Sequence, residues 1–137
     1  MALANEDGLN TLTGGIIYSA MEVHRQLGPG LLESSYRTCL AYELRERGMT
    51  VGIELELPLR YKSVVLDAGY KLDVVVNSTV IVEVKAVIGV LPVHRAQLIT
   101  YLKLTGYPAG LLLNFNVPLM KNGVTRVLNT KPAGNRT

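Results

Sequence analysis

Hydrophobic residues in the first third of the chain recur at helical spacing, with an apolar position on one face at nearly every turn. This spacing predicts a helix over 11–27, which ends at a Gly-Pro-Gly turn, and a second helix over about 31–47. The apolar stripe of the first helix is Ile16, Ala20, Val23 and Leu27, and that of the second is Leu32, Tyr36, Leu40 and Leu44.

From residue 51 the hydrophobic period changes to two, which is typical of strands. Apolar positions alternate with polar ones over 51–59, and Pro58 indicates an edge strand or the end of a strand. Apolar runs and turn residues then predict a short strand within 61–66, strands at 70–76 and 80–87, a helix over 92–105, a strand at 109–115 and a last short strand at 124–128.

The order of these elements predicts an α/β fold with a mixed sheet. The strand, helix and strand at 80–87, 92–105 and 109–115 form a βαβ unit, so these two strands should be parallel with a right-handed crossover. The strands before them are joined by short turns and should be antiparallel. We expect one domain over residues 1–137, with a core at about 12–128 and loose ends.

Composition is typical of a globular chain. Of 137 residues, 48% are hydrophobic and 18% charged, and no apolar run approaches the roughly 20 residues of a membrane helix. No signal peptide is visible, and Cys39 is the only cysteine, which excludes an internal disulfide and a cysteine-based zinc site; these points favour the cytoplasm. A net charge of +3 permits an anionic partner, and with no Trp and one Phe a base-stacking platform would have to use Tyr.

Two charged residues stand inside the most apolar strand, VIVEVKAV. Burying a charge costs several kcal/mol unless it is paired or holds a metal, yet Glu83 and Lys85 share one face of this strand. If the loop between the strands is residues 77–79, Asp73 lies opposite Glu83, with Cβ atoms about 4.5–5.5 Å apart. A two-residue loop would instead place Asp73 on the other face, so register decides the chemistry.

Two opposed carboxylates indicate a site for a divalent cation. Mg²⁺ commonly takes one or two carboxylates with water and phosphate oxygens, so Asp73, Glu83 and the backbone carbonyl of Val84 could hold it. Lys85 would then orient the attacking water or neutralise developing charge. The alternative is a structural Asp–Lys or Glu–Lys pair on a sheet face exposed to water.

These residues resemble the PD-(D/E)XK nuclease superfamily, in Asp73, then Glu83-Val84-Lys85 on the next strand, then a helix carrying Gln97. The stretch GLLESSY, residues 30–36, resembles the motif that names the GxxExxY family within it. The likeness extends over roughly 12–128. The chain departs from the superfamily name in having Tyr70-Lys71-Leu72 before Asp73, without a Pro-Asp dipeptide.

The resemblance implies a restriction-endonuclease-like core, a four-stranded mixed sheet flanked by helices in αβββαβ order, here with an extra N-terminal helix. It also implies Mg²⁺- or Mn²⁺-dependent hydrolysis of phosphodiester bonds, with nucleic acid as partner, DNA favoured over RNA. By resemblance, Glu33 is an acidic residue near the metal, reached through water, and Gln97 orients a water or the lysine. The alternatives are a Glu that favours the helix dipole and a solvated helix Gln.

Further residues are weaker candidates for contact with substrate. Tyr36 could hold Glu33 or touch phosphate, or it could be a core residue. The remaining candidates are His24, His94, which shares a helix face with Gln97, and a scattered basic set of Lys62, Lys71, Arg95, Lys103, Lys121 and Arg126.

Two classes of function are compatible with these patterns. One is a metal-dependent nuclease, which the presence of all three residues Asp73, Glu83 and Lys85 favours. The other is a non-catalytic nucleic-acid-binding or protein-interaction module that retains the nuclease fold. A chain of this size has little surface left to grip a duplex, so we also expect a two-fold homodimer, using the 51–59 strand or the first helix, with a monomer as the alternative.

Overall fold

The protein is an α/β structure, described by a computed structural model over residues 6–67 and 69–130. In chain order its elements are α1 (Glu6–Leu27), α2 (Glu33–Glu46), β1 (Val51–Glu56), β2 (Leu59–Tyr61), β3 (Val64–Leu66), β4 (Lys71–Val76), β5 (Val80–Lys85), α3 (Pro92–Thr105), β6 (Ala109–Asn114), η2 (Met120–Gly123) and β7 (Val124–Leu128). No helix in these described ranges is both long and apolar enough to span a bilayer.

A five-stranded mixed sheet in the order β1-β4-β5-β6-β7 forms the centre of the fold. The predicted parallel pair is β5 and β6, and the other neighbouring pairs are antiparallel. The predicted register of the central hairpin is confirmed near the loop, since Val76 pairs with Val80 and Val75 with Ile81. The predicted pair of Asp73 with Glu83 is not part of this ladder, which ends at Val74↔Val82. The sheet has one strand more than the predicted four-stranded core, because β7 pairs with β6 at its far edge.

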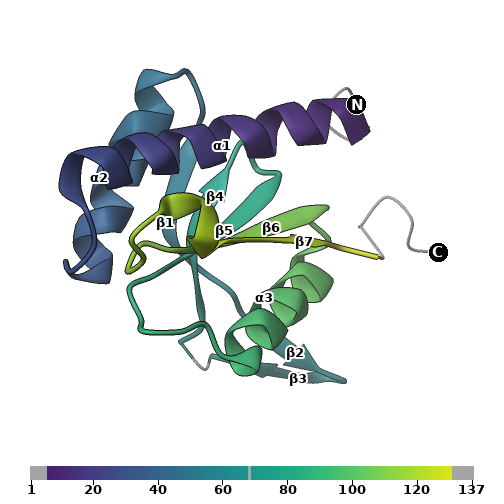
Figure 1. The fold of residues 1–137 in the computed structure, drawn as a ribbon. Coiled ribbons are helices and arrows are strands. Elements are labelled where there is room, and N and C mark those ends of the chain that lie inside the picture. The colour runs from purple at the N-terminus through teal and green to yellow at the C-terminus, as the bar shows by residue number, and fades with distance from the viewer. Residues whose placement is uncertain (1–5, 68, 131–137) are drawn as a thin grey trace.

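Helices cover both faces of this sheet (Figure 1). α1 and α2 lie on one face, over an apolar cluster that contains Val74, Val76, Val82 and Val84. α3 lies on the other face, over a second cluster that contains Val75 and Ile81. The two clusters use alternate residues of the same strands, as a sheet buried on both faces requires.

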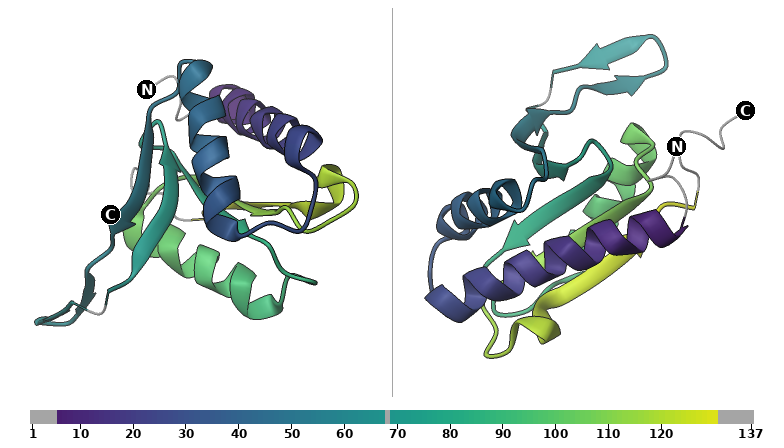
Figure 2. Two further views of the ribbon diagram at one scale, coloured as in Figure 1. Left: turned by 90° about the vertical axis from the view of Figure 1, so that its left-hand side faces the viewer. Right: turned by 90° about the horizontal axis from the view of Figure 1, so that it is seen from above.

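The predicted strand over 51–59 is two strands. β1 ends at Glu56, and after Leu57-Pro58 the chain forms the hairpin β2–β3, a separate two-stranded sheet that projects beyond the main sheet (Figure 2). Pro58 therefore marks a strand end, and β1 is an edge strand.

The ends of the chain differ in part from the expectation of loose termini. Helix α1 already begins at Glu6, so residues 6–8 are helical, with the acidic Glu6 and Asp7 in the first turn, where they favour the helix dipole. Residues 1–5 and 131–137 lie outside the described residues.

Candidate active site

The regular pairing of strand β4 fails on both sides of Asp73. On one side the β1–β4 register passes from Ile53↔Val74 to Leu55↔Leu72, and on the other the β4–β5 pairs end at Val74. Strict alternation would place Leu72 with Val74, yet Leu72 packs in the α3-side cluster with Val75. The strand is therefore irregular at Asp73, and this residue is paired in neither ladder.

Side chains replace the missing ladder contacts between β4 and β5. The backbone N–H of Val84 donates to Asp73 Oδ2 at 2.8 Å, and the N–H of Asp73 donates to Glu83 Oε2 at 3.3 Å. Each carboxylate thus accepts an N–H from the opposite strand. These two bonds connect Asp73 and Glu83 near the end of β5, although the two residues are not the directly opposed ladder pair that the three-residue loop predicted.

The carboxyl group of Glu83 is buried beside other negative charges, which disfavours its ionised form. Glu83 is only 6% exposed. Its pKa is raised to about 7, first by burial, then by the negative charge of Asp73 and to a smaller extent by that of Glu33, while the N–H of Asp73 and the charge of Lys85 act to lower it. The site holds more negative charge than its surroundings stabilise, so Glu83 favours either a proton or a cation.

Helix α2 sends two charged side chains to this end of the sheet. Arg37 Nη1 pairs with Asp73 Oδ1 at 2.9 Å, with the arginine side chain 20% exposed and the aspartate 14%. One turn earlier, Glu33 Oε2 accepts the backbone N–H of Ala86, just past β5, at 3.3 Å. Both residues line an open pocket of about 510 Å³ together with Ala86. The sequence interpretation missed Arg37, although its i+4 spacing from Glu33 places it on the same helix face.

The GLLESSY stretch builds the turn that positions these two side chains. Gly30 has φ +102°, a left-handed conformation that only glycine adopts without strain. The Tyr36 hydroxyl donates to the Gly28 carbonyl at 2.6 Å and accepts the N–H of Leu31, while its ring stacks on Phe115 at 4.6 Å. Tyr36 is fully buried, so the structure gives it a structural role and leaves it unable to touch a phosphate in this arrangement.

Lys85 and the following residues are held by strand β6. Lys85 pairs with Asn114 in the parallel ladder, and its charge acts on Glu83 from the same strand. The buried Asn114 side chain bonds both the N–H and the carbonyl of Val87, at 3.0 Å each. Asn114 was also missed, although one amide inside the apolar run LLLNF was a signal for a buried polar contact.

Gln97 is an exposed residue of α3, and neither Asp73 nor Glu83 shares its pocket. It lines a pocket between α3 and the base of the hairpin β2–β3, together with Tyr70 and Tyr101. Burial raises the pKa of Tyr101, and the charges of Glu83 and Tyr70 raise it further, so Tyr101 lies near Glu83.

The weaker candidates lie apart from the carboxylates. His94 accepts the N–H of Leu91 on its Nδ1 at 3.0 Å and so caps α3. His24 is buried, and its Nε2 bonds the Val117 carbonyl at 2.7 Å, a structural contact between α1 and the chain after β6. Arg95 is exposed beside Val127 and Asn129, in a different recess from Gln97. The structure thus does not bring these three residues to the Asp73–Glu83 pair.

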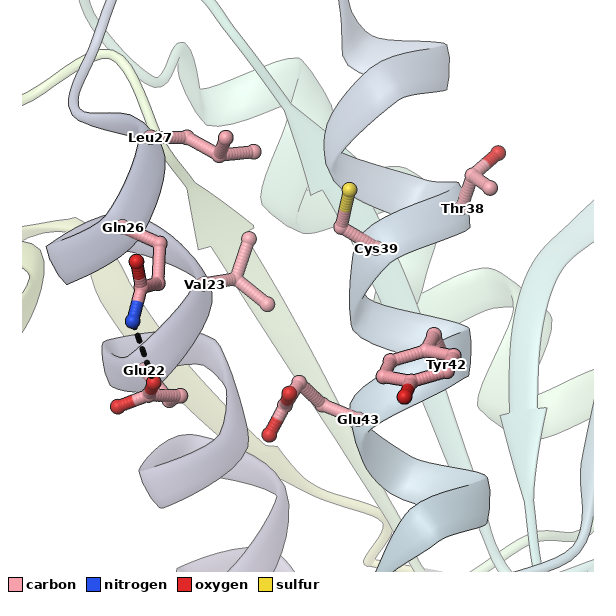
Figure 3. A pocket seen from close by; sticks show the side chains of 8 residues that line it. All are labelled: Glu22, Val23, Gln26, Leu27, Thr38, Cys39, Tyr42 and Glu43. Atoms are coloured by element: carbon pink, nitrogen blue, oxygen red, sulfur yellow. Dashed lines mark hydrogen bonds between the residues drawn. The ribbon is translucent and has the colours of Figure 1, made fainter.

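An apolar recess of about 380 Å³ lies elsewhere, between α1 and α2 (Figure 3). Val23 and Leu27 of α1 face Cys39 and Tyr42 of α2 across it, with Glu22 and Glu43 at its rim. None of the predicted site residues lines this recess, so we place the candidate chemistry at Asp73 and Glu83.

Comparison with known families agrees with this geometry. A family model described as the PD-(D/E)XK nuclease superfamily matches residues 10–127. The chain belongs to this superfamily. Neither a search of curated proteins nor a search of solved structures gave a significant match. Superfamily membership indicates a nuclease-type function with a nucleic-acid substrate, and PD-(D/E)XK nucleases generally use divalent metal ions.

Two carboxylates are present that could bind such an ion, but a fuller set of protein ligands is not found among the described residues. Within residues 6–67 and 69–130, no group of three or more His, Cys, Asp or Glu side chains is arranged to hold a metal. The donor set is therefore the two carboxylates, which suits an ion that completes its shell with backbone, water and phosphate oxygens. A cation here would also relieve the repulsion that raises the pKa of Glu83.

Proposed function

We propose that this protein is a metal-dependent nuclease that hydrolyses phosphodiester bonds, with DNA as the favoured substrate. The observation that carries the proposal is the buried Glu83 beside Asp73, with Lys85 two residues further along the same strand. Fold stability alone gives no reason to bury two mutually repelling carboxylates at a strand end.

Each side chain has a task in this proposal. Asp73, Glu83 and the carbonyl of Val84 hold Mg²⁺ or Mn²⁺, and Glu33 contributes through water. The bound ion supplies Lewis-acid stabilisation of the phosphate and lowers the pKa of a bound water. Lys85 orients that water or neutralises charge on the phosphate, and Asn114 holds the chain after β5 so that Lys85 keeps its direction.

The GLLESSY stretch supports assignment to the GxxExxY family as part of the proposal. Its glycine forms the turn, its tyrosine fastens that turn, and its glutamate reaches the end of β5. In this interpretation, the motif forms the turn that positions Glu33 and Arg37 beside Asp73 and Glu83.

A cleavage assay with purified protein tests the function. Single-stranded, duplex and branched DNA and RNA are incubated with Mg²⁺, Mn²⁺ or EDTA. Cleavage that needs the metal and falls by at least about 100-fold in Asp73→Asn, Glu83→Gln and Lys85→Met supports the proposal. Glu22→Gln is the matched control, because it makes the same chemical change in a carboxylate paired with Arg25 on α1.

One observation favours a second candidate, a non-catalytic nucleic-acid-binding or protein-interaction module. Arg37 already supplies a positive charge to Asp73, and Val84 occupies the other carboxylate oxygen. A site satisfied in this way need not bind a metal. Titration with Mn²⁺, followed by electron paramagnetic resonance, distinguishes the two candidates, because only the nuclease requires saturable binding that Glu83→Gln abolishes.

We also propose that the protein acts as a homodimer. The edge strand β1 remains the candidate surface, since it pairs with β4 on one side only. Light scattering over a concentration series, with and without DNA, tests this proposal. A monomer at every concentration contradicts it and favours the processing of single strands.

A further inference from the structure

A pocket of about 190 Å³ lies between α3 and the base of the β2–β3 hairpin. Its lining combines two aromatic rings, apolar side chains, one amide and one hydroxyl, from Leu57, Leu59, Tyr70, Gln97, Thr100, Tyr101 and Leu104. None of these side chains carries a formal charge. The pocket therefore suits a flat apolar group with polar atoms at its edge better than it suits a phosphate.

This pocket adjoins the candidate active site. Its inner wall is Tyr101, which is 7% exposed and packs in one cluster with Leu72, the residue before Asp73, and with Ile81. Its outer wall is Tyr70, which is 44% exposed and lies three residues before Asp73. The charge of Glu83 acts on Tyr101, so this wall of the pocket faces the region of the carboxylates.

Two side chains of the pocket are free to meet a ligand. Tyr70 is exposed, whereas Tyr101 is buried. Gln97 is exposed, and its amide makes no hydrogen bond to any part of the chain that the structure describes. An amide can both donate and accept, so it can pair with the polar edge of a base.

The hairpin beside the pocket is basic and aromatic. Residues 57–66 include Arg60 and Lys62 and no acidic residue, and both basic side chains are exposed. Tyr61 is 61% exposed, with the Lys62 ammonium 5.3 Å from the centre of its ring. Basic residues interleaved with exposed aromatic rings are the features that bind single strands.

We propose that this pocket, the base pocket, binds one unpaired nucleobase of the substrate strand. The base stacks on Tyr70 and presents its polar edge to Gln97, while Arg60 and Lys62 contact the flanking phosphates. A base inside a duplex is stacked on both faces and paired along one edge, so only an unstacked, unpaired base can enter. The substrate class is therefore nucleic acid that is single-stranded or locally unpaired; this inference rests on the proposed function in taking nucleic acid as the substrate.

Binding without metal tests the base pocket separately from catalysis. A fluorescently labelled 12-nucleotide single strand, the same strand with its central nucleotides made abasic, and a blunt duplex are titrated with the protein in EDTA. Fluorescence anisotropy should give an affinity for the base-bearing strand about 10-fold or more above that for the abasic strand. Equal affinities for the two strands would overturn the proposal.

Variants locate the effect in the pocket. Tyr70→Ala and Gln97→Leu should each reduce the preference for bases over abasic sites, and Tyr70→Phe should retain the stacking part. The matched control is Tyr42→Ala, because Tyr42 is also an exposed tyrosine, 61% exposed against 44% for Tyr70, and lies on α2 outside the pocket. Thermal melting confirms that each variant folds. The same preference in Tyr70→Ala as in Tyr42→Ala would also overturn the proposal.

Contacts of the protein with the phosphates of the strand should affect binding differently from contacts with the base. Arg60→Gln with Lys62→Gln should weaken binding to base-bearing and abasic strands alike and lower the salt dependence. If metal-dependent cleavage is absent while the base preference in EDTA persists, the catalytic proposal fails and the base pocket stands. If cleavage occurs and the base preference is absent, the base pocket fails and the nuclease stands.

Discussion

The two ends of the β4–β5 hairpin contain the same kind of strand and do different things. Near the loop, Val76 pairs with Val80 and Val75 with Ile81, and all four side chains are buried in apolar clusters. At the other end, beyond Val74, the ladder pairing stops, and backbone N–H groups donate to the carboxylates of Asp73 and Glu83 instead. One end contributes to stability through packing, whereas the other end holds charge at a cost to stability.

This difference shows how a small fold can carry a reactive site. The regular half of the hairpin buries enough apolar surface to hold both strands in register. Register then brings Asp73 and Glu83 together even though they repel each other. Substitutions at the end with Asp73 and Glu83 should therefore cost little stability. Substitutions in the regular half near the loop should have little direct effect on activity.

The largest expected effect separates the two ends by activity. Glu83→Gln should lower metal-dependent cleavage by about 1000-fold, because it removes one of the two carboxylates that hold the ion. Val82→Ala, one residue away in the regular half, should retain activity within a few-fold and lose about 2 kcal/mol of unfolding free energy. Cleavage rates and urea unfolding measured on both variants check this. Similar activity losses in the two variants would show that the ends are not separable.

The second prediction concerns pH and the protein without metal. Glu83 ordinarily titrates near 4.5, and in the folded protein its pKa is about 7 because of burial and the charge of Asp73. Between these values the folded state binds more protons than the unfolded chain, so the unfolding free energy falls as pH rises from about 4.5 to about 7. The loss attributable to Glu83 is about 3 kcal/mol, and it is constant above pH 7.

Urea unfolding in EDTA at several pH values measures this loss. The difference between wild type and Glu83→Gln isolates it, since Glu33, Asp73 and Lys85 remain in both proteins. A difference that does not change between pH 4.5 and 7 would mean that Glu83 is not held under stress. Added Mg²⁺ should reduce the loss, because an ion replaces the proton.

The third prediction concerns the cation that the protein itself supplies. Arg37→Met leaves Asp73 beside Glu83 without its partner, and should lower the unfolding free energy by about 1–2 kcal/mol in EDTA, because the pair is only partly exposed. Saturating Mg²⁺ or Mn²⁺ should restore most of this loss and bind more tightly than in wild type. Arg45→Met is a control on the same helix, since Arg45 bonds only the Val51 carbonyl at the protein surface. A loss that metal does not reverse would make Arg37 a purely structural partner.

Much of the site could be predicted from the sequence because it follows from register. The loop at residues 77–79 fixes the pairs up to Val74↔Val82, and this register places Asp73 and Glu83 near each other on neighbouring strands. Arg37 could not be predicted in this way, since a helix arginine is usually solvated and its partner Asp73 lies 36 residues further along the chain. The surroundings of Gln97 also depended on tertiary structure, because the sequence predicted a short strand within 61–66 but not the separate β2–β3 hairpin whose base lies beside α3.

The same limit applies to the motif residues. Tyr36 has the spacing of a core residue and also that of a motif residue, and the structure shows it in the core while it fastens the turn. His24 and His94 bond backbone groups, a use that depends on where loops lie in space. Spacing along one helix cannot distinguish these outcomes, since the partners come from elsewhere in the chain.

The smallest expected effect concerns the backbone of the edge strand beside Asp73. Glu54 has φ +51°, at the position where the β1–β4 register skips Asp73. A left-handed conformation costs a non-glycine residue about 1–2 kcal/mol, whereas glycine adopts it freely but loses more entropy on folding. Glu54→Gly should therefore raise the unfolding free energy by about 0.5 kcal/mol.

Glu56→Gly is the matched control, because it makes the same change in the same strand at a residue without a positive φ. It should lower the unfolding free energy by about 0.5–1 kcal/mol, since glycine weakens a strand where no strain is relieved. Urea unfolding of both variants, in EDTA and at one pH, measures the difference. If the two glycines cost the same, the irregular backbone beside Asp73 stores no strain, and the contrast between the two ends of the hairpin is electrostatic alone.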